Sequence, residues 1–293
     1  MADPIADELR ALYGDASKHS GYQSIPDFVS AALGYSESID EGWRGDKPRL
    51  AYLRTVREPL DGELWGDFGA NTGFFTLSMA HAYPKTRFAA IEPNPNHAEF
   101  IQRVAGYFGL GNVEVIPRAI GLRELRELPK FDFLLHMNVL HHAGHDFDND
   151  LVHTLPQFPD YALRYLNALR SHADGMLFQI GSNWGGSKQQ PLIGVREDFA
   201  KRRLFTSWLE DAGWRIEATA YPRKERDKGI AYHDIAPLGD EVAEQDAQAL
   251  NSSRGMNELD VFPGEFYRRP LFLCASPTRL GSSVPCTERT AHE

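Results

Sequence analysis

The stretch from residue 63 to residue 75 constrains the fold of this chain more than any other. Residues 63–68 are rich in bulky strand-forming side chains, and apolar residues at helical spacing begin at Thr76. Between them, Gly69 and Gly73 bracket a tight turn, where a side chain would hinder a positive φ and block a ligand from the backbone. A strand, a turn and a helix in this order point backbone N–H groups at whatever binds above the strand.

A second predicted strand, 87–92, ends in Glu92, about twenty residues beyond the turn. An acidic side chain at that spacing can accept hydrogen bonds from both hydroxyls of a ribose. The turn and the acid together predict a cofactor that contains a nucleoside. The dinucleotide fingerprint G-x-G-x-x-G is absent, because the turn reads Gly69-x-Asn71-x-Gly73.

The chain at this point resembles the class I S-adenosylmethionine-dependent methyltransferases. In that family an acidic residue and a glycine-rich turn follow the first strand, and residues 67–73 match this pattern with Asn71 in place of the middle glycine. Glu92 matches the family's acid after the second strand, and residues 131–142 match its fourth-strand segment. The resemblance covers about residues 48–222 and the last strand. It implies S-adenosylmethionine as the cofactor.

The resemblance also implies which residues contact the cofactor. They are Asp67, Gly69, Asn71, Gly73, Glu92, Pro93, Arg118, Ala119, Ile120 and Asn138. Residues 118–120 follow the third predicted strand, in the turn that touches adenine in the family. The acidic residue that usually contacts the adenine amino group is absent there, so we expect backbone groups to recognise the base.

Alternating strands and helices from residue 62 onward predict an α/β fold. We expect a doubly wound, mostly parallel sheet of seven strands with helices on both faces. The predicted strands are 63–68, 87–92, 112–117, 131–137, 175–181, 214–220 and 271–275, the last inserted antiparallel as in the family. The predicted helices of this part are 48–58, 73–83, 95–108, 158–171 and 199–212.

Regions outside the core are also predicted. Residues 1–47 form an N-terminal helical cap with two short helices between residues 4 and 34, and residues 48–222 form the cofactor-binding core. Residues 223–263 are a substrate-side insertion, 264–276 hold the last core strand, and 277–293 are a disordered tail. We expect the cap and the insertion to cover the substrate, although the cap helices can equally well pack on the edge of the sheet.

Ionisable and polar residues gather after the fourth predicted strand, where α/β sheets bind ligands. They are His136, Asn138, His141, His142, His145, Asp146 and Asp148. Three interpretations stay open: a histidine that is the general base for an alcohol, a divalent metal bound by this segment, or histidines that cap the next helix or line the pocket. As catalytic residues we rank His142 first, His141 second, and His145 with Asp146 third. We assign no metal ligands, and an amine acceptor would need no strong base.

Four residues are candidate substrate contacts: Trp43, Trp184, Tyr232 and His233. An aromatic ring beside a sulfonium or an amino substrate would stabilise its positive charge. Ordinary packing in loops is the alternative for each ring. Tyr232, His233 and Asp234 also offer a base with a residue that orients it, ranked below the cluster after the fourth strand.

Composition and charge limit the partners of the chain. It has 293 residues and a formal net charge of −10, which disfavours nucleic acid. Its two cysteines, Cys274 and Cys286, form neither a disulfide framework nor a zinc pattern. The N-terminus lacks an apolar secretory core, and no apolar run is long enough to cross a bilayer. We therefore expect a cytoplasmic protein that acts on a small molecule and does not bind a membrane. A homodimer is possible.

These observations favour a methyltransferase that acts on an oxygen or nitrogen atom of a small polar metabolite. A sugar or amino sugar of a natural product, such as an antibiotic, is favoured because the pocket-side loops are polar and the protein is acidic. A tRNA-modifying methyltransferase is the first alternative, since a wobble-uridine-modifying branch has a similar asparagine-containing turn. The second is a non-catalytic binding subunit, against which the intact Asp67, Gly69 and Glu92 argue.

Overall fold

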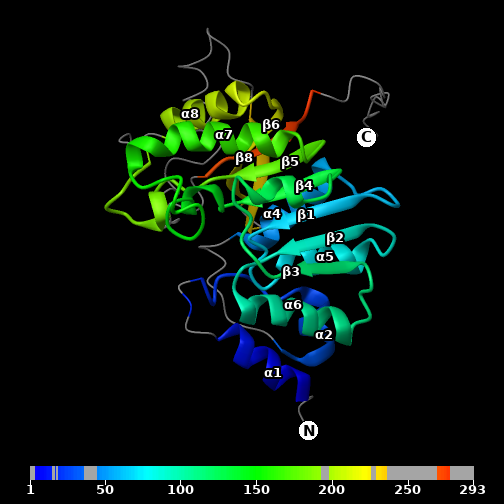
Figure 1. Ribbon diagram of the computed structural model, residues 1–293. Coiled ribbons are helices and arrows are strands. Elements are labelled where there is room, and N and C mark those ends of the chain that lie inside the picture. Colours follow the sequence, from blue (N-terminus) through cyan, green and yellow to red (C-terminus); the bar gives the residue numbers. More distant parts are fainter. Residues whose placement is uncertain are drawn as a thin grey trace, which may run out of the picture.

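Eight strands form one sheet in the described part of the chain. The structure is a computed structural model, and it describes residues 4–14, 17, 19–35, 45–192, 198–225, 229–235 and 269–277. The strands lie in the order β3-β2-β1-β4-β5-β8-β6-β7 (Figure 1). Their bounds are β1 Leu64–Phe68, β2 Arg87–Ile91, β3 Val113–Ile116, β4 Phe133–Met137, β5 Gly175–Gln179, β6 Arg215–Glu225, β7 Gly229–Ile235 and β8 Leu271–Ala275.

The first five strands, β1 to β5, pair in parallel with one another. β8 is antiparallel to both β5 and β6, between which it lies. The predicted α/β fold, the mostly parallel sheet and the antiparallel last strand are therefore confirmed. Because β1, β2 and β4 end at the same edge of the sheet, residues 69–73, Glu92 and residues 138–142 follow one another around that edge.

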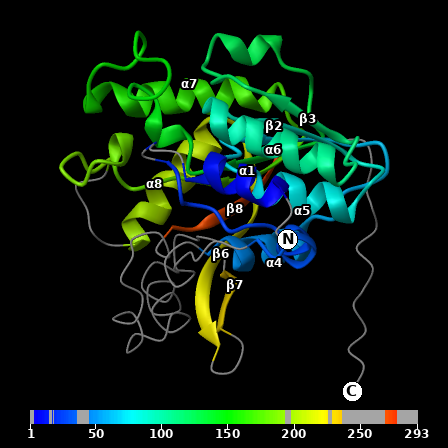
Figure 2. The ribbon, with the colours of Figure 1, turned by 90° about the horizontal axis from the view of Figure 1, so that it is seen from below.

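The prediction of seven strands is wrong, because β7 lies within residues 223–263, the predicted insertion. β6 also crosses the predicted boundary at residue 222. β8 pairs with β6 only as far as Ala220, so the outer part of β6 pairs with β7 alone, and Figure 2 shows this pair extending from the sheet. The charged residues and Pro222 in this part of the sequence are typical of a loop. A strand at the edge of a sheet tolerates both, because the backbone on its outer side needs no hydrogen-bond partner. Residues 236–263 and 278–293 lie outside the described residues.

The predicted helices occur close to their predicted bounds. They are α1 Pro4–Tyr13, α2 Asp27–Leu33, α4 Asp46–Val56, α5 Phe74–Ala82, α6 Pro95–Tyr107, α7 Phe158–Arg170 and α8 Asp198–Asp211. Among the residues that the structure describes, no helix has both the length and the apolar character that a bilayer crossing requires.

Successive side chains of a strand point to opposite faces, and helices cover both faces. Leu134 of β4 packs in one apolar cluster with α7 and α8, whereas Phe133 and Leu135 pack in another with α4 and α5. Figure 2 shows α7 and α4 on opposite sides of the sheet. A third cluster joins Ala90 of β2 to α6, α1 and α2. Sheet residues are thus apolar on both faces, as a doubly wound fold requires.

The N-terminal helices pack on the molecule rather than apart from it. α1 packs against α6, and both lie with α2 beyond the β3 end of the sheet (Figure 1). The connection between α1 and α2 returns to the carboxyl edge of the strands, where His19 and Gln23 contact the glycine turn. That this segment and the predicted insertion cover a substrate stays a prediction.

Candidate active site

The turn between β1 and α5 has the left-handed backbone that its glycines predict. Gly69 has a φ of 64° and Gly73 a φ of 78°. A Cβ atom on Gly69 would lie 2.7 Å from Cγ2 of Val139, and one on Gly73 would lie 2.7 Å from Cγ1 of Ile101. Asn71 has a φ of 54°, a conformation that asparagine adopts more readily than most residues. It can therefore replace the middle glycine of the family pattern without changing the turn.

The same turn fixes Glu92 at the end of β2. The backbone N–H of Gly69 donates to the carbonyl of Ile91 at 2.9 Å, which holds the turn against β2. The backbone N–H of Asn71 donates to Oε2 of Glu92 at 2.7 Å, and that of Asn94 donates to Oε1 at 2.8 Å. Each carboxylate oxygen accepts one backbone hydrogen bond and keeps a lone pair for a further donor. Glu92 is thus oriented at the position that the sequence predicts for ribose binding.

A buried histidine, His97, lies next to the carboxylate of Glu92. His97 has no exposed surface, and its Nδ1 lies 3.7 Å from Oε1 of Glu92. Its Nε2 lies 3.0 Å from Oγ of Ser20 in the N-terminal segment. The side chain of Asn94 accepts hydrogen bonds from the first turn of α6 and so sets the position of His97. Sequence reasoning missed His97, although the cap at Asn94 places it in the first helical turn.

Asp67 lies inside the site on β1. Burial raises the pKa of its carboxyl group to about 7, and the nearby carboxylate of Glu92 adds to this rise. The hydroxyl of Thr76, which donates to Oδ2 at 2.8 Å, and the guanidinium of Arg49 oppose it. The carboxyl group therefore titrates close to neutral pH and would gain from a positively charged neighbour.

Residues 19–23 lie against the glycine turn. The side-chain amide of Asn71 donates to the backbone carbonyl of His19 at 2.8 Å. Oε1 of Gln23 accepts a hydrogen bond from the backbone N–H of Phe74 at 3.1 Å, at the first residue of α5. The N–H groups that the sequence predicts for ligand binding are thus partly engaged by this segment. Neither His19 nor Gln23 was predicted, because nothing local marks their contact with the turn.

The first-ranked catalytic residue, His142, lies beside Asp146. Residues Leu140–His142 form a short 3₁₀ turn after β4. Nδ1 of His142 lies 2.9 Å from Oδ2 of Asp146, and Nε2 of His19 lies 3.2 Å from the same oxygen. The rings of His19 and His142 meet edge to face with centroids 5.1 Å apart. The structure therefore brings two predicted residues together and adds one that was missed.

His141 has different surroundings. It is buried, and its Nδ1 accepts a hydrogen bond from the backbone N–H of Gly181 at 3.3 Å. Burial holds the pKa of His141 well below its usual value, and the neighbouring His142 and Arg269 lower it further. The neutral imidazole of His141, which follows β4, is hydrogen-bonded to Gly181, which follows β5, and so links the ends of the two strands. Its catalytic role stays a prediction, and its contacts indicate a packing role.

His145 and Trp184 pack on each other with ring centroids 4.4 Å apart. The indole N–H of Trp184 donates to the backbone carbonyl of Ala143 at 2.7 Å, and the side chain is buried. These contacts fold the loop after β4 onto the loop after β5. The predicted substrate role of Trp184 and the predicted catalytic role of His145 are not tested by these contacts.

A polar network joins the ends of β4, β5 and β8. Nδ2 of Asn138 donates to Oε1 of Gln179 at 2.8 Å, and Oδ1 of Asn138 accepts from Arg269 at 2.7 Å. Arg49 of α4 donates to the same Gln179 oxygen at 3.2 Å and to Asp46 at 2.5 Å. Asn138 was predicted to bind the cofactor. The network holds its side chain at the carboxyl edge of the sheet.

Tyr232 of β7 lies near this network. Burial raises the pKa of its hydroxyl, and the positive charge of Arg49 opposes that rise. Asp234 accepts a hydrogen bond from the hydroxyl of Tyr52 at 2.6 Å, and strand alternation places His233 on the other face of β7. The base and orienting residue that Tyr232, His233 and Asp234 offer stay a prediction. Trp43, the remaining predicted substrate contact, lies outside the described residues.

The predicted adenine turn after β3 offers little side-chain chemistry. Arg118 is exposed and pairs with Glu127 at 2.7 Å. Ile120 is buried, and its backbone carbonyl accepts from the hydroxyl of Tyr165 at 3.2 Å. Ala119, between them, is partly exposed. These three positions, like Pro93 after β2, stay predictions.

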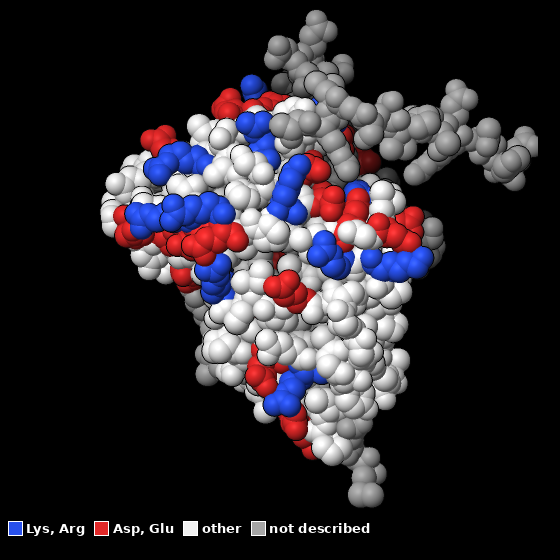
Figure 3. Space-filling view, turned by 45° about the vertical axis from the view of Figure 1, so that its right-hand side comes forward, with Lys and Arg blue, Asp and Glu red and all other residues white. Residues whose placement is uncertain are grey.

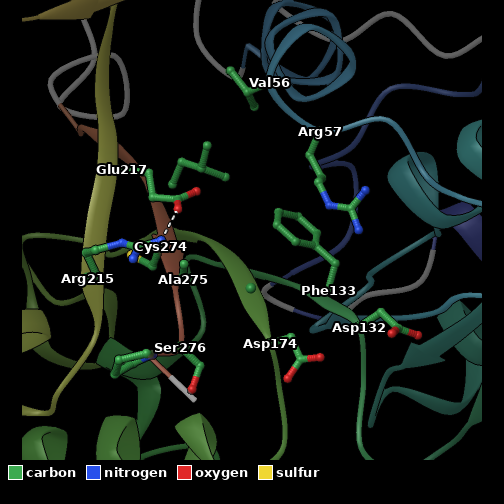
Figure 4. Close-up of a pocket in the computed structure, with 13 residues that line it drawn as sticks. Val56, Arg57, Asp132, Phe133, Asp174, Arg215, Glu217, Cys274, Ala275 and Ser276 are labelled. Carbon is green, nitrogen blue, oxygen red and sulfur yellow. Dashed lines mark hydrogen bonds and ion pairs between the residues drawn. The ribbon is translucent and has the colours of Figure 1, made fainter. Parts of the chain in front are cut away.

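A separate cleft of about 220 Å³ lies at the opposite edge of the sheet (Figure 4). Asp132 and Asp174 line it at the amino ends of β4 and β5, with Arg57 above them. Arg215 and Glu217 form an ion pair of 2.6 Å on its β6 side. Ligands of α/β sheets bind at the carboxyl ends of the strands, so this cleft is not the candidate active site.

Comparisons with known proteins give distant likenesses. No family model matches the chain. Cyclosporin synthetase simA from Tolypocladium inflatum is 28% identical over 164 residues, which are 52% of this chain and 1% of that protein. This chain therefore spans a small part of the length of that relative.

Three solved structures are distantly similar to this chain. The N-terminal domain of EvdMO1, with S-adenosylhomocysteine bound, is 16% identical, with a TM-score of 0.47 over 78% of this chain and 92% of that one. A SAM-dependent methyltransferase from Aquifex aeolicus is 18% identical, with a TM-score of 0.41 over 64% and 89%. The 4+2 cyclase SpnF is 14% identical, with a TM-score of 0.49 over 93% and 92%. Sequence identity and TM-score are low for all three, so these likenesses assign no function to this chain.

Proposed function

We propose that this chain is a class I S-adenosylmethionine-dependent methyltransferase that acts on an oxygen or nitrogen atom of a small polar metabolite. The observation that carries the proposal is Glu92, whose two oxygens are held by the N–H groups of Asn71 and Asn94 beside a left-handed turn. A carboxylate fixed in this way can accept both hydroxyls of a ribose without rearranging.

The cofactor fits the residues around Glu92. Gly69 is exposed, so its backbone is open to the methionine part of the cofactor. Asp67, with its pKa near 7, would be stabilised as a carboxylate by the ammonium group of that part. The adenine would lie toward residues 118–120. Bound S-adenosylmethionine supplies a methyl group on a sulfonium, and the protein positions the acceptor in line with it.

The acceptor side of the site would face His142 and Asp146. These two residues follow β4, next to β1, and they lie across the turn from Glu92. An alcohol acceptor must lose its proton as the methyl group is transferred, so it needs a group on this side that makes its oxygen reactive. An amine acceptor needs only to be held as the free base.

The surface supports a small substrate rather than a nucleic acid. The chain carries 31 Lys and Arg against 41 Asp and Glu residues. On the face shown in Figure 3, basic side chains are interspersed with acidic ones rather than gathered in one area. A nucleic-acid partner would favour a basic stripe that follows its phosphates. A sugar or amino sugar fits the polar loops around the turn, whereas the tRNA alternative rests on the asparagine-containing turn.

Titration calorimetry with S-adenosylhomocysteine tests the proposal. Wild type should bind, and Glu92→Ala should bind about 10- to 100-fold more weakly, because about 1.5–3 kcal/mol is lost when ribose hydroxyls lose a charged acceptor. Glu99→Ala, which removes an exposed glutamate of α6, should bind as wild type does. Equal affinity of wild type and Glu92→Ala would contradict the placement of the ribose.

A further inference from the structure

Three side chains from two distant segments point ligand atoms at one place beside the glycine turn. They are His19, His142 and Asp146, and each offers a ligand atom within 4.8 Å of those of the other two. Oδ2 of Asp146 is the shared centre, 2.9 Å from His142 and 3.2 Å from His19. Two imidazoles and one carboxylate are a donor set that divalent transition metals prefer.

The spacing of these atoms fits ligands of a single ion. Two ligand atoms at about 2.1 Å from an ion and at right angles to each other are separated by about 3 Å. The two distances to Oδ2 of Asp146 match this separation. The rings of His19 and His142 are nearly perpendicular, at 86°, so they converge on Asp146 instead of stacking on each other.

The backbone fixes all three residues before any ion binds. The backbone carbonyl of His142 accepts hydrogen bonds from the N–H groups of His145 and Asp146 at 3.0 and 2.9 Å, which closes one turn and puts His142 and Asp146 on the same side. His19 is tied to the glycine turn through Asn71. The side chains of His19, His142 and Asp146 are 36%, 18% and 30% exposed, so the place is open to solvent and to an acceptor.

We propose that His19, His142 and Asp146 bind one divalent transition-metal ion, such as Mn²⁺ or Zn²⁺, in this chain. The nitrogen donors favour such an ion over Mg²⁺ or Ca²⁺, which prefer oxygen ligands. Three protein ligands leave coordination positions for oxygens of the acceptor. The proposal takes up one of the three interpretations that the sequence left open, a divalent metal at the segment after β4, for which no ligands were assigned. It adds His19, which had no predicted role.

The ion would activate a hydroxyl group of the acceptor, and this part of the proposal rests on the proposed function. A hydroxyl bound to the ion has a lowered pKa and releases its proton to solvent. Its oxygen then attacks the methyl carbon, the S–CH₃ bond breaks as the O–CH₃ bond forms, and the sulfur keeps the electron pair. A substrate with two adjacent oxygens, such as a vicinal diol of a sugar, would fill two positions of the ion.

The experiment measures metal binding directly, on the full chain without a histidine tag. After treatment with EDTA and its removal, Mn²⁺ binding is followed by the loss of the free-ion electron paramagnetic resonance signal. Wild type should bind one ion per chain. His19→Ala and Asp146→Asn should each weaken binding roughly 100-fold. His153→Ala removes an exposed histidine outside the cluster and should bind as wild type does.

The outcomes are decisive because thermal unfolding and S-adenosylhomocysteine affinity are recorded for the same samples. Variants that stay folded and bind Mn²⁺ like wild type, or a wild type that binds none, overturn the metal site. Methyl transfer that persists in EDTA but disappears in His142→Ala, while cofactor affinity is intact, overturns the ion's part in the reaction and assigns His142 as a base. Metal binding in a protein without affinity for the cofactor leaves the site standing and removes the proposed function.

Discussion

At the scale of single residues, Asp67 should make cofactor binding depend on pH. Its pKa of about 7 in the free protein means that it is mostly protonated at pH 6 and mostly ionised at pH 8. A cationic ammonium group binds the ionised form, so affinity for S-adenosylhomocysteine should rise roughly 10-fold from pH 6 to pH 8. Calorimetry at pH 6, 7 and 8 checks this. Asp67→Asn should bind weakly with a flat profile, and a flat profile in wild type would place the ammonium elsewhere.

His136 should make stability depend on pH in the opposite sense to Asp67. It is fully buried in β4 between aromatic rings, and burial lowers its pKa from 6.5 to about 4. Between these values the unfolded chain binds a proton that the folded chain does not, so stability present above pH 6.5 is lost as pH falls toward 4. The loss should be about 2 kcal/mol between pH 7.5 and pH 5.

Urea unfolding at pH 7.5 and pH 5 measures this loss. His136→Leu keeps a side chain of similar volume without a titrating group. The fall in unfolding free energy should be about 2 kcal/mol smaller in the variant than in wild type. The raised pKa of Asp67 makes the unfolding free energy rise as pH falls. This contribution is the same in wild type and variant, so it cancels in the comparison. Equal falls would mean that His136 takes up its proton without unfolding.

Single residues also mark the limit of what the sequence predicts. Glu92 was found because a carboxylate at the end of a strand follows the glycine turn at a fixed interval, and local geometry decides its place. The contact of His19 with Asp146 spans 127 positions, and only the path of the chain between α1 and α2 creates it. His141 was ranked close to His142, yet burial separates the two neighbours, and burial depends on the packing of Gly181.

At the scale of elements, a side chain added to a glycine should destabilise the turn after β1 but not α6. Gly73→Ala puts Cβ at 2.7 Å from Ile101 on a backbone with positive φ, so it should destabilise the fold by about 1–3 kcal/mol. Gly106→Ala, on an exposed turn of α6 with no atom within 4 Å, should be neutral or stabilising by up to about 1 kcal/mol. Thermal unfolding of both variants checks the contrast. Similar costs would mean that the turn can relax.

Elements were predicted best where burial is two-sided. β1, β2 and β4 lie inside the sheet, so most of their residues are apolar, and the residues that follow them are Gly69, Glu92 and Asn138. β7 was missed because it forms the edge, pairs only with β6 and faces solvent on one side. Its sequence, with a glycine first and the polar residues His233 and Asp234 side by side, lacks the alternation of a strand and is typical of a loop. The predicted boundary at residue 222 falls within β6.

At the scale of the whole molecule, the site depends on two segments that are far apart in the sequence. The N-terminal segment reaches the turn through His19 and Gln23, and the hydroxyl of Tyr13 in α1 donates to the carbonyl of Gln23 at 2.7 Å. α1 in turn packs on α6, whose first turn carries His97 against Glu92. The proposed contact between the cofactor and Glu92 is therefore linked to the packing of the N-terminal helices.

This linkage predicts a shared response to ligands in hydrogen exchange. S-adenosylhomocysteine should slow exchange in residues 19–26 and 69–77 together, because the cofactor would bind between them and hold the segment on the turn. Residues 158–170 of α7, on the far face, should exchange at an unchanged rate. An acceptor added with the cofactor should further protect residues 1–47 and 223–263. Protection of residues 69–77 without protection of residues 19–26 would show that the N-terminal segment is not part of the cofactor site. Equal exchange in residues 223–263 with and without acceptor would count against the prediction that these residues cover the substrate.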